Sequence, residues 1–337
     1  MDALEETQAS QAVPQTKGPA APPHDEQDMF GVALGFLAFF IWGLFPIYFA
    51  LLSDVPPLVT LAFRAVFTTV TLVPMILTLR RGPAILRALR NPWYDAGLFV
   101  TMAMTGASWG FFIWLVARNN TTYASLGNYA CPLVTVAFAA LIFRERPRPY
   151  QILAIALAAV AVVVFAVGVG RLPWESVIVA FVFAIYSVLR KMMDVDSTTA
   201  LSVETLFATP IAVGYILYSA FAPEHAPAWA LDKSTLALLV GGGAMTAAPL
   251  LLFGAAAHRC RLSTLGVLNY LTPTGQFICG AFLLHEKTTI YQWLSFALIW
   301  IALTFFTIDL FRHEKETRIA ADDAQAPSAH EQQAPDR

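Results

Sequence analysis

Two charged side chains stand inside long apolar stretches of this sequence, where they could bind a ligand or move a proton. They are Arg64 and Glu204. A charge inside a membrane-spanning helix is costly and by default indicates a functional site. Arg64 favours a substrate with an anionic group, with snorkelling to the outer surface as the alternative, and Glu204 is the better candidate for proton coupling. Their predicted depths, roughly 7–10 Å below opposite membrane faces, argue against a direct ion pair.

A second set of candidate residues occurs twice in the chain. The pattern Asn-Tyr-x2-Pro-x12-Glu-x4-Tyr-Gln begins at Asn128 and again at Asn269, so six identical residues are displaced by 141 positions. The chain is therefore interpreted as a duplication. Helix interruptions at corresponding positions of two halves point to the substrate site of a transporter, near the middle of the membrane. The alternative is that both motifs only form a kinked contact between the repeats.

Three prolines and several aromatic residues complete the predicted site. A proline in a membrane helix frees the carbonyl group one turn earlier, which then needs another partner. Pro46, Pro132 and Pro273 are therefore predicted to break helices. Rings with polar groups suit an aromatic or amphipathic solute, with packing and an interfacial aromatic belt as alternatives. The predicted lining of a midplane cavity is Trp42, Tyr48, Trp109, Asn128, Tyr129, Asn269 and Tyr270.

The remaining reactive residue types do not indicate catalysis. Cys131, Cys260 and Cys279 lie in or beside apolar segments without metal-ligand spacing, and are interpreted as small hydrophobic residues. The sequence lacks His-x3-His and Cys-x2-Cys, and it lacks the Gly-x4-Gly-Lys-Ser/Thr loop of ATP-driven transport. Glu145 and Glu286 are interpreted as ion pairs that lock loops. We expect no enzyme activity, metal or cofactor; a membrane scaffold or sensor is the alternative function, and an intramembrane enzyme a less favoured one.

The elements that must hold these residues are membrane helices. The mean hydropathy is +0.61, and 13% of the residues are charged, whereas about 25% is usual in soluble domains. The apolar residues form blocks of roughly 20, which is the length that crosses the hydrocarbon core. The sequence therefore predicts an all-α membrane protein with ten transmembrane helices. The predicted spans are 30–52, 57–79, 95–116, 123–143, 150–169, 173–189, 200–221, 234–257, 262–284 and 290–310.

The distribution of lysine and arginine sets the predicted orientation. With a cytoplasmic N-terminus, the inside segments hold 16 of the 21 basic residues and the outside loops hold four. This asymmetry favours both termini in the cytoplasm. Five helices per copy is an odd number, so the second copy must cross in the opposite sense, as in the inverted-topology repeats of secondary transporters. The predicted organisation is a disordered cytoplasmic tail (1–28), a first repeat (29–169), a second repeat (170–311) and a disordered cytoplasmic tail (312–337).

Several short motifs follow one another in the order of a known family. They are Phe40-Ile41-Trp42-Gly43 with Pro46, Ala124-Ser125-Leu126-Gly127 with Pro132-Leu133-Val134, Arg190-Lys191, Glu204-Thr205, and Arg261-Leu262-Ser263-Thr264-Leu265-Gly266. These motifs resemble the RarD family, in the EamA branch of the drug/metabolite transporter superfamily, over residues 30–310. The resemblance implies a permease of the bacterial inner membrane with ten helices in two EamA repeats, of a kind often labelled for chloramphenicol sensitivity or resistance. The related small multidrug exporters use an acidic residue in their first helix; the first span here has none, so their proton-antiport mechanism is not carried over.

The sequence thus predicts a secondary transporter of small organic solutes that works by alternating access between two inverted repeats. The expected partners are a small-molecule substrate and the lipid bilayer. The apolar fifth span, 150–169, is either a scaffold helix or the interface of a homodimer. No nucleic acid partner is expected.

Overall fold

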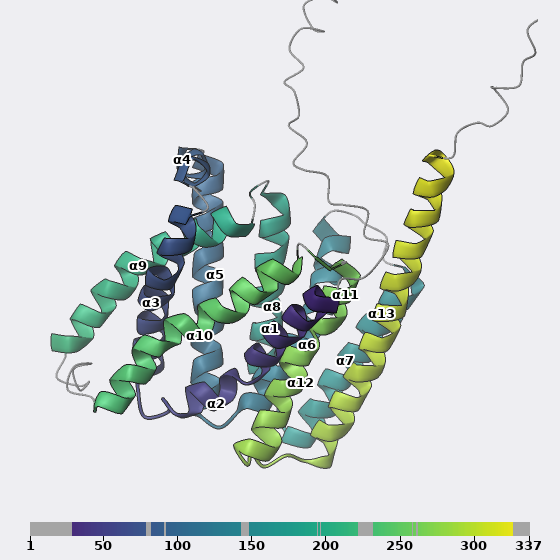
Figure 1. Ribbon diagram of the computed structural model, residues 1–337. Coiled ribbons are helices and arrows are strands. Elements are labelled where there is room, and N and C mark those ends of the chain that lie inside the picture. Colours follow the sequence, from purple (N-terminus) through teal and green to yellow (C-terminus); the bar gives the residue numbers. More distant parts are fainter. Residues whose placement is uncertain are drawn as a thin grey trace, which may run out of the picture.

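The structure is a computed structural model that describes residues 29–78, 82–90, 92–142, 148–193, 195, 197–221, 232–257, 259–260 and 262–325. The predicted tail 1–28 and Glu145 lie outside these residues. Throughout the described part the regular structure is helical, with no strand (Figure 1). The predicted all-α class is therefore confirmed for this part of the chain.

The helices of the first half begin with a broken one. The chain turns at Leu44, between α1 and α2, and a short helix, α4, stands between the long helices α3 and α5. The bounds are α1 (Met29–Gly43), α2 (Phe45–Ala50), α3 (Pro57–Thr78), α4 (Gly82–Arg90), α5 (Pro92–Ala117), α6 (Thr121–Ile142) and α7 (Pro149–Val169).

The second half also contains one broken helix. A turn at Asn269 and Tyr270 separates α11 from α12, and α12 continues into a π-helical turn, η2. The bounds are α8 (Trp174–Met192), α9 (Ser197–Phe221), α10 (Lys233–Ala257), α11 (Leu262–Leu268), α12 (Leu271–Ile278), η2 (Cys279–Leu283) and α13 (Ile290–Gln325).

Eight helical segments of the described chain are long and apolar enough to cross a membrane, as judged by length and composition. The sixth predicted span corresponds to α8, which is not among them and which carries Glu175, Arg190 and Lys191 within 19 residues. The ninth predicted span corresponds to α11, α12 and η2, each too short to cross alone. The eight segments are Met29–Ala50, Pro57–Pro74, Pro92–Ala117, Thr121–Ile142, Pro149–Val169, Thr199–Phe221, Lys233–Ala257 and Ile290–Arg312.

The long helices begin at matching positions in the two halves. The starts of α5 and α10, of α6 and α11, and of α7 and α13 are each separated by the 141 positions that separate the sequence repeats. The starts of α3 and α9 are 140 positions apart. We call helices that match in this way equivalent helices.

Two pairs of equivalent helices, α7 with α13 and α3 with α9, pack on each other and run in opposite directions. Helix α7 lies along α13 (Figure 1), and the Ser295 hydroxyl donates a hydrogen bond of 2.7 Å to the carbonyl oxygen of Ala161 at the middle of this contact. At one end Arg148 pairs with Asp309 at 3.1 Å, and at the other Gly168 packs against Tyr291. Because residue numbers rise on one helix as they fall on the other, the pair is antiparallel.

The pair α3 and α9 is antiparallel in the same way. The hydroxyl groups of Thr69 and Thr209 lie 2.8 Å apart. Towards the start of α3, Val59 and Phe63 belong to one apolar cluster with Tyr215, near the end of α9. Thr69 and Thr209 are themselves 140 positions apart, so this contact joins two equivalent positions.

The repeated glutamine of the sequence motif has a local structural role. The side-chain Oε1 of Gln151 accepts a hydrogen bond of 3.1 Å from the backbone N–H of Arg148, and that of Gln292 accepts one of 2.7 Å from Thr289. The first N–H groups of a helix have no partner within the helix, so a side-chain acceptor stabilises its start. The same cap therefore begins α7 and α13.

The predicted ion pair of Glu286 is wrong, because its carboxylate caps a helix instead. The two oxygens accept hydrogen bonds from the backbone N–H groups of Thr121 and Thr122, the latter at 2.9 Å. The Glu286 side chain is buried, and the positive end of the α6 dipole favours a carboxylate there.

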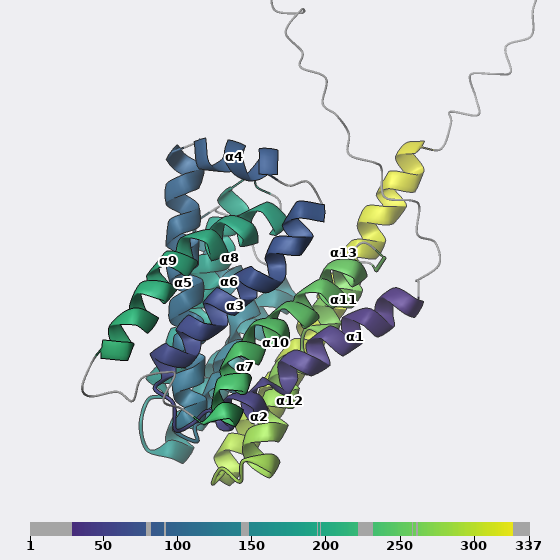
Figure 2. The ribbon, with the colours of Figure 1, turned by 60° about the vertical axis from the view of Figure 1, so that its left-hand side comes forward.

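Helix α13 is longer than predicted. The sequence predicts a disordered segment from 312 onwards, whereas α13 continues to Gln325. The stretch after Arg312 is rich in Glu, Lys, Arg and Ala, which are strong helix formers, so a helix that has already started can continue through it. In both views the far end of α13 and the short helix α4 lie at the same end of the bundle (Figure 2).

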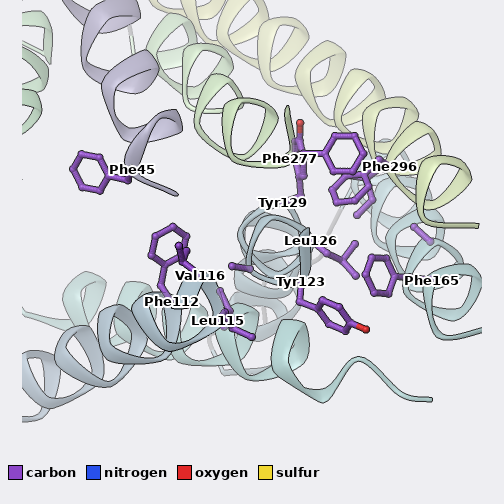
Figure 3. Packing of buried hydrophobic residues seen from close by; sticks show 14 of the residues in the cluster. Phe45, Phe112, Leu115, Val116, Tyr123, Leu126, Tyr129, Phe165, Phe277 and Phe296 are labelled. Carbon is purple, nitrogen blue, oxygen red and sulfur yellow. The ribbon is translucent and has the colours of Figure 1, made fainter. Parts of the chain in front are cut away.

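The largest buried cluster of apolar side chains joins the two halves around α6. Figure 3 shows the rings of Phe277, from α12, and Phe296, from α13, beside one another; their centroids are 3.8 Å apart. Tyr129 of α6 packs edge to face on Phe296. Close packing, more than the hydrophobic effect, holds helices together in a lipid environment.

Replacing Gly243 with alanine is expected to destabilise the contact between α10 and α3. A Cβ atom at Gly243 would clash with the backbone carbonyl group of Phe67, whereas one at Gly254 of the same helix would meet nothing within 4 Å. Overpacking typically costs about 1–3 kcal/mol. Thermal unfolding in detergent should therefore show a lower midpoint for Gly243→Ala and an unchanged or higher one for Gly254→Ala. Equal midpoints for the two variants would contradict the packing described here.

Candidate functional site

A cavity of about 620 Å³ lies between the two halves. Its wall is mostly apolar, and each half contributes side chains. Helices α3 and α9 meet at Thr69 and Thr209, and both contribute to this wall. Of the residues predicted for the site, those that line the cavity are Trp42, Arg64, Trp109, Asn128, Pro132, Glu204, Asn269 and Pro273.

Many lining residues occupy matching positions in the two halves. On α3 and α9, the pairs at an offset of 140 positions include Leu61 with Leu201 and Arg64 with Glu204. Elsewhere the offset is 141 positions. Those pairs are Trp42 with Phe183, Thr105 with Thr246, Trp109 with Leu250, Asn128 with Asn269, Cys131 with Thr272, and Pro132 with Pro273.

Arg64 is held in the cavity wall by neutral groups. Its guanidinium carbon lies 3.8 Å from the ring centroid of Trp109, which is a cation–π contact. Its Nε donates a hydrogen bond of 2.9 Å to the hydroxyl oxygen of Thr246 on α10. This placement differs from snorkelling, because the charged group is fixed to two helices inside the protein.

Trp109 belongs to an aromatic cluster that supports this position. Its ring centroid lies 5.7 Å from those of Phe45 and Phe112, in tilted and edge-to-face arrangements. Phe45 and Phe112 are almost fully buried. The Trp109 ring is therefore fixed on one side by packing while it also faces the cavity.

Glu204 enters the cavity wall from α9. Its side chain is buried, and its Oε1 accepts a hydrogen bond of 2.7 Å from the hydroxyl group of Thr101 on α5. Arg190, near the end of α8, interacts with Tyr186, another residue of the cavity wall. The prediction that Arg64 and Glu204 form no direct ion pair agrees with these separate partners.

The repeated asparagines reach the cavity from α6 and from the turn before α12. The side-chain Nδ2 of Asn128 donates a hydrogen bond of 2.8 Å to the side-chain oxygen of Gln276. One turn earlier on α6, the Ser125 hydroxyl donates to the carbonyl oxygen of Pro273 at 2.7 Å. These bonds join the two halves at the cavity wall. The Asn269 residue is exposed and lies in the turn itself.

The three predicted tyrosines are not in the cavity wall. The hydroxyl of Tyr48 donates to the carbonyl oxygen of Leu238, and that of Tyr129 bonds to Thr274 and accepts a hydrogen bond of 2.7 Å from the indole nitrogen of Trp300. Tyr270 is half-buried against the main apolar cluster. Neighbouring helical residues point about 100° apart, so Asn128 can face the cavity while Tyr129 faces the core.

The three predicted helix breaks do not behave alike. Pro46 lies at the start of α2, directly after the turn at Leu44, and Pro273 lies near the start of α12, after the turn at Asn269. Helix α6, however, runs through Pro132 without interruption, so the break predicted there is wrong. Proline is well tolerated in the first turn of a helix, where its missing N–H is not needed.

Sequence reasoning missed several residues of the site. Thr246 and Thr101 hold the two charged groups, and Gln276 binds Asn128. Of these residues, only Thr246 could have been found from the sequence, because it matches Thr105 at the repeat offset. Within the residues that the structure describes, no group of three or more His, Cys, Asp or Glu side chains could hold a metal ion.

Comparisons with known proteins identify the family of the chain. The sequence model of the EamA-like transporter family matches the chain twice, over residues 29–167 and 176–308. Protein RarD of Streptomyces exfoliatus is 36% identical over 90% of this chain and 96% of its own length. An uncharacterized transporter of Vibrio cholerae is 37% identical over 85% of this chain and 94% of its own length, and Protein RarD of Escherichia coli is 33% identical over 87% and 98%.

A protein of known crystal structure shares the fold. It superposes with a TM-score of 0.56 at 19% sequence identity, covering 82% of this chain and 97% of that chain.

Removing the hydroxyl group of Tyr129 is expected to lower stability without changing ligand binding at the cavity. Tyr129→Phe removes the hydroxyl group that bonds both Thr274 and the indole N–H of Trp300, and the two lost hydrogen bonds together cost about 1–3 kcal/mol. Thermal unfolding should show a lower midpoint for this variant than for Tyr218→Phe, a change at an exposed tyrosine of α9. If Tyr129→Phe instead abolished binding at normal stability, Tyr129 would belong to the site.

Proposed function

Because the chain belongs to the EamA-like transporter family, we propose that it carries small organic solutes by alternating access around the cavity between its two halves. That it is a membrane transporter of the drug/metabolite type, and not an enzyme, follows from the family and from relatives that are named as transporters. The RarD resemblance is also confirmed by relatives of that name. The mechanism, the site residues and the orientation are our proposal.

The observation that carries the mechanism is the paired lining of the cavity. Matching positions of the two halves face one space, and the equivalent helices α3 and α9 beside it run in opposite directions. We propose ten transmembrane helices, with α1 and α2 as one span and α11, α12 and η2 as another, in two inverted repeats. Two similar halves of opposite orientation can exchange conformations, so states open to either side have similar free energies.

We propose that both termini face the cytoplasm of a bacterial cell, with the protein in the inner membrane. Helix α4, with Arg87 and Arg90, and the far end of α13, with Arg312, lie at the same end of the bundle (Figures 1 and 2). Arg148 and its partner Asp309 belong to that end as well. Basic residues of membrane proteins are concentrated on the cytoplasmic side, so we propose that this end of the bundle faces the cytoplasm.

Each residue of the site has a proposed role. Trp42 and Trp109 offer ring surfaces to the solute, and Asn128 and Asn269 offer amide groups to its polar atoms. Arg64 is the binding cation, and Glu204 is the candidate for proton coupling. The cavity volume of about 620 Å³ lies within the roughly 300–1,000 Å³ that is usual for sites of drug-sized ligands.

Counterflow in proteoliposomes is the direct test of the proposed function. Purified protein should exchange labelled solutes from a panel of metabolites and drugs across the membrane, while empty liposomes should not. Chloramphenicol belongs in this panel because one relative, of Pseudomonas aeruginosa and 28% identical, is called chloramphenicol-sensitive protein RarD. Absence of exchange for every solute would favour a scaffold or sensor.

Alanine at Asn128 or Asn269 is expected to reduce counterflow at least tenfold while membrane insertion stays normal. Asn128→Ala removes a hydrogen bond between the halves at the cavity wall, and Asn269→Ala removes the matching amide. Thr304→Ala, at an exposed residue of α13 whose hydroxyl bonds only its own helix, serves as the control. Near-normal exchange in both asparagine variants would remove these residues from the site.

Glu204→Gln is expected to abolish the dependence of transport on a pH gradient. The amide keeps the size of the side chain and can still accept a hydrogen bond from Thr101, but it cannot release a proton. Glu316→Gln, at an exposed position on the outer part of α13, should leave the response unchanged. A Glu204→Gln protein that still accumulates solute in response to the gradient would show that Glu204 does not couple protons to transport.

A further inference from the structure

The two charged side chains of the cavity wall have equivalent positions but different surroundings. Arg64 on α3 and Glu204 on α9 match at the offset of these two helices. A direct ion pair between them would leave neither charge available to a ligand. Their partners show that they form no such pair, and the cation without an anionic partner indicates the kind of substrate.

Glu204 is held by a neutral group of its own. Thr101 donates a hydrogen bond of 2.7 Å to its carboxylate, and no ion pair within 4.0 Å joins this carboxylate to a described basic side chain. Arg64 and Glu204 therefore do not pair with one another.

Arg64 has no anionic partner among the described residues. Its neighbours are the ring of Trp109 at 3.8 Å and the hydroxyl of Thr246 at 2.9 Å, and no described carboxylate lies within 4.0 Å of its nitrogen atoms. A buried cation without an anionic partner is costly. A negatively charged group on a bound solute would supply the partner that Arg64 lacks.

The geometry of Arg64 suits a carboxylate. Its Nε is engaged by Thr246, and one face of the guanidinium group lies on Trp109. The two terminal nitrogens make no hydrogen bond to the described residues, and Arg64 is part of the cavity wall. An arginine with free terminal nitrogens can bind both oxygens of a carboxylate at once, which is stronger than a neutral hydrogen bond.

The rest of the wall suits an apolar body. The rings of Trp42, Trp109 and Phe112 line the cavity together with aliphatic side chains such as Leu58 and Leu61. We propose that the transported solute is an organic monoanion whose carboxylate binds Arg64 and whose aromatic or otherwise apolar body packs against Trp109 and Phe112. This inference rests on the proposed function, since it assigns the substrate class of the same cavity.

Matched acids and amides test this assignment, because the two members of each pair differ chiefly in charge. The probes are phenylacetate with phenylacetamide, naphthoate with naphthamide, and indoleacetate with indoleacetamide, together with phenethylamine as a cation and tryptophan as a zwitterion. Binding to the full-length protein in detergent would be measured by calorimetry and by thermal shift. We expect at least one acid to bind roughly ten- to a hundredfold more tightly than its amide and than the amine.

Variants of Arg64 connect this preference to one side chain. Arg64→Gln should bring the acid to the affinity of its amide, and Arg64→Lys should keep part of the preference, because the charge remains but the paired donors do not. The control is Arg118→Gln, at an exposed arginine that lies over Trp114 outside the cavity wall. It should leave the preference unchanged.

Several results would overturn the inference. These are equal or tighter binding of the amides, the amine or the zwitterion, no binding of any acid, and a preference for acids that survives in Arg64→Gln. Counterflow of the same compounds separates this inference from the proposed function. If only neutral or cationic solutes were exchanged, the protein would be a transporter whose substrates are not anions. If acids bound in an Arg64-dependent way but no solute were exchanged, the anion site would stand and the proposed transport function would be contradicted.

Discussion

The contact between α3 and α9 is the constraint on which the site depends. The hydroxyl groups of Thr69 and Thr209 meet at equivalent positions, 2.8 Å apart, so the two helices touch at matching points. Side chains near this contact are therefore presented in matching pairs to the same space. Arg64 and Glu204 form one such pair, and they reach the cavity because the repeat places them there. In lipid, where apolar residues gain little by contacting one another, such a polar contact between hydroxyl groups also helps to fix the helices.

The symmetry of the backbone and the asymmetry of the charges have different consequences. Matching halves make the two states of the proposed cycle similar in free energy, so a modest ligand preference shifts their populations. The charges do not match: Arg64 is stacked on Trp109, while the position equivalent to Trp109 is Leu250, which cannot hold a cation in this way. In the proposed mechanism, substrate recognition therefore depends on a feature of one half only, and the exchange of states depends on what both halves share.

The sequence predicted the fold better than it predicted the site. Long apolar blocks were sufficient for the all-α class and for most of the long helices, because these depend on local composition. Tyr129 was assigned to the cavity together with Asn128, although a helix turns adjacent side chains towards different neighbours. Pro132 was expected to break α6 as Pro273 does in the other half, yet its helix is continuous. Gln276 could not be found at all, because its role arises only when α12 packs against α6. These errors concern tertiary packing, about which a single sequence carries little information.

The two real helix breaks meet, and this explains how they are tolerated. Gly43, at the end of α1, packs against Gly275 in α12 with no side chain between their backbones. Around this point side chains of the second half bond to backbone carbonyl groups of α1: the thiol of Cys279 donates to the carbonyl oxygen of Gly43 at 3.5 Å, and the hydroxyl of Thr272 donates to that of Phe39 at 3.2 Å. An unsatisfied backbone group would cost several kcal/mol in a lipid interior, so an interrupted helix must lie against protein or a polar space. The breaks therefore belong beside the cavity, where the wall residues Trp42 and Asn269 lie next to backbone that is less constrained than a continuous helix.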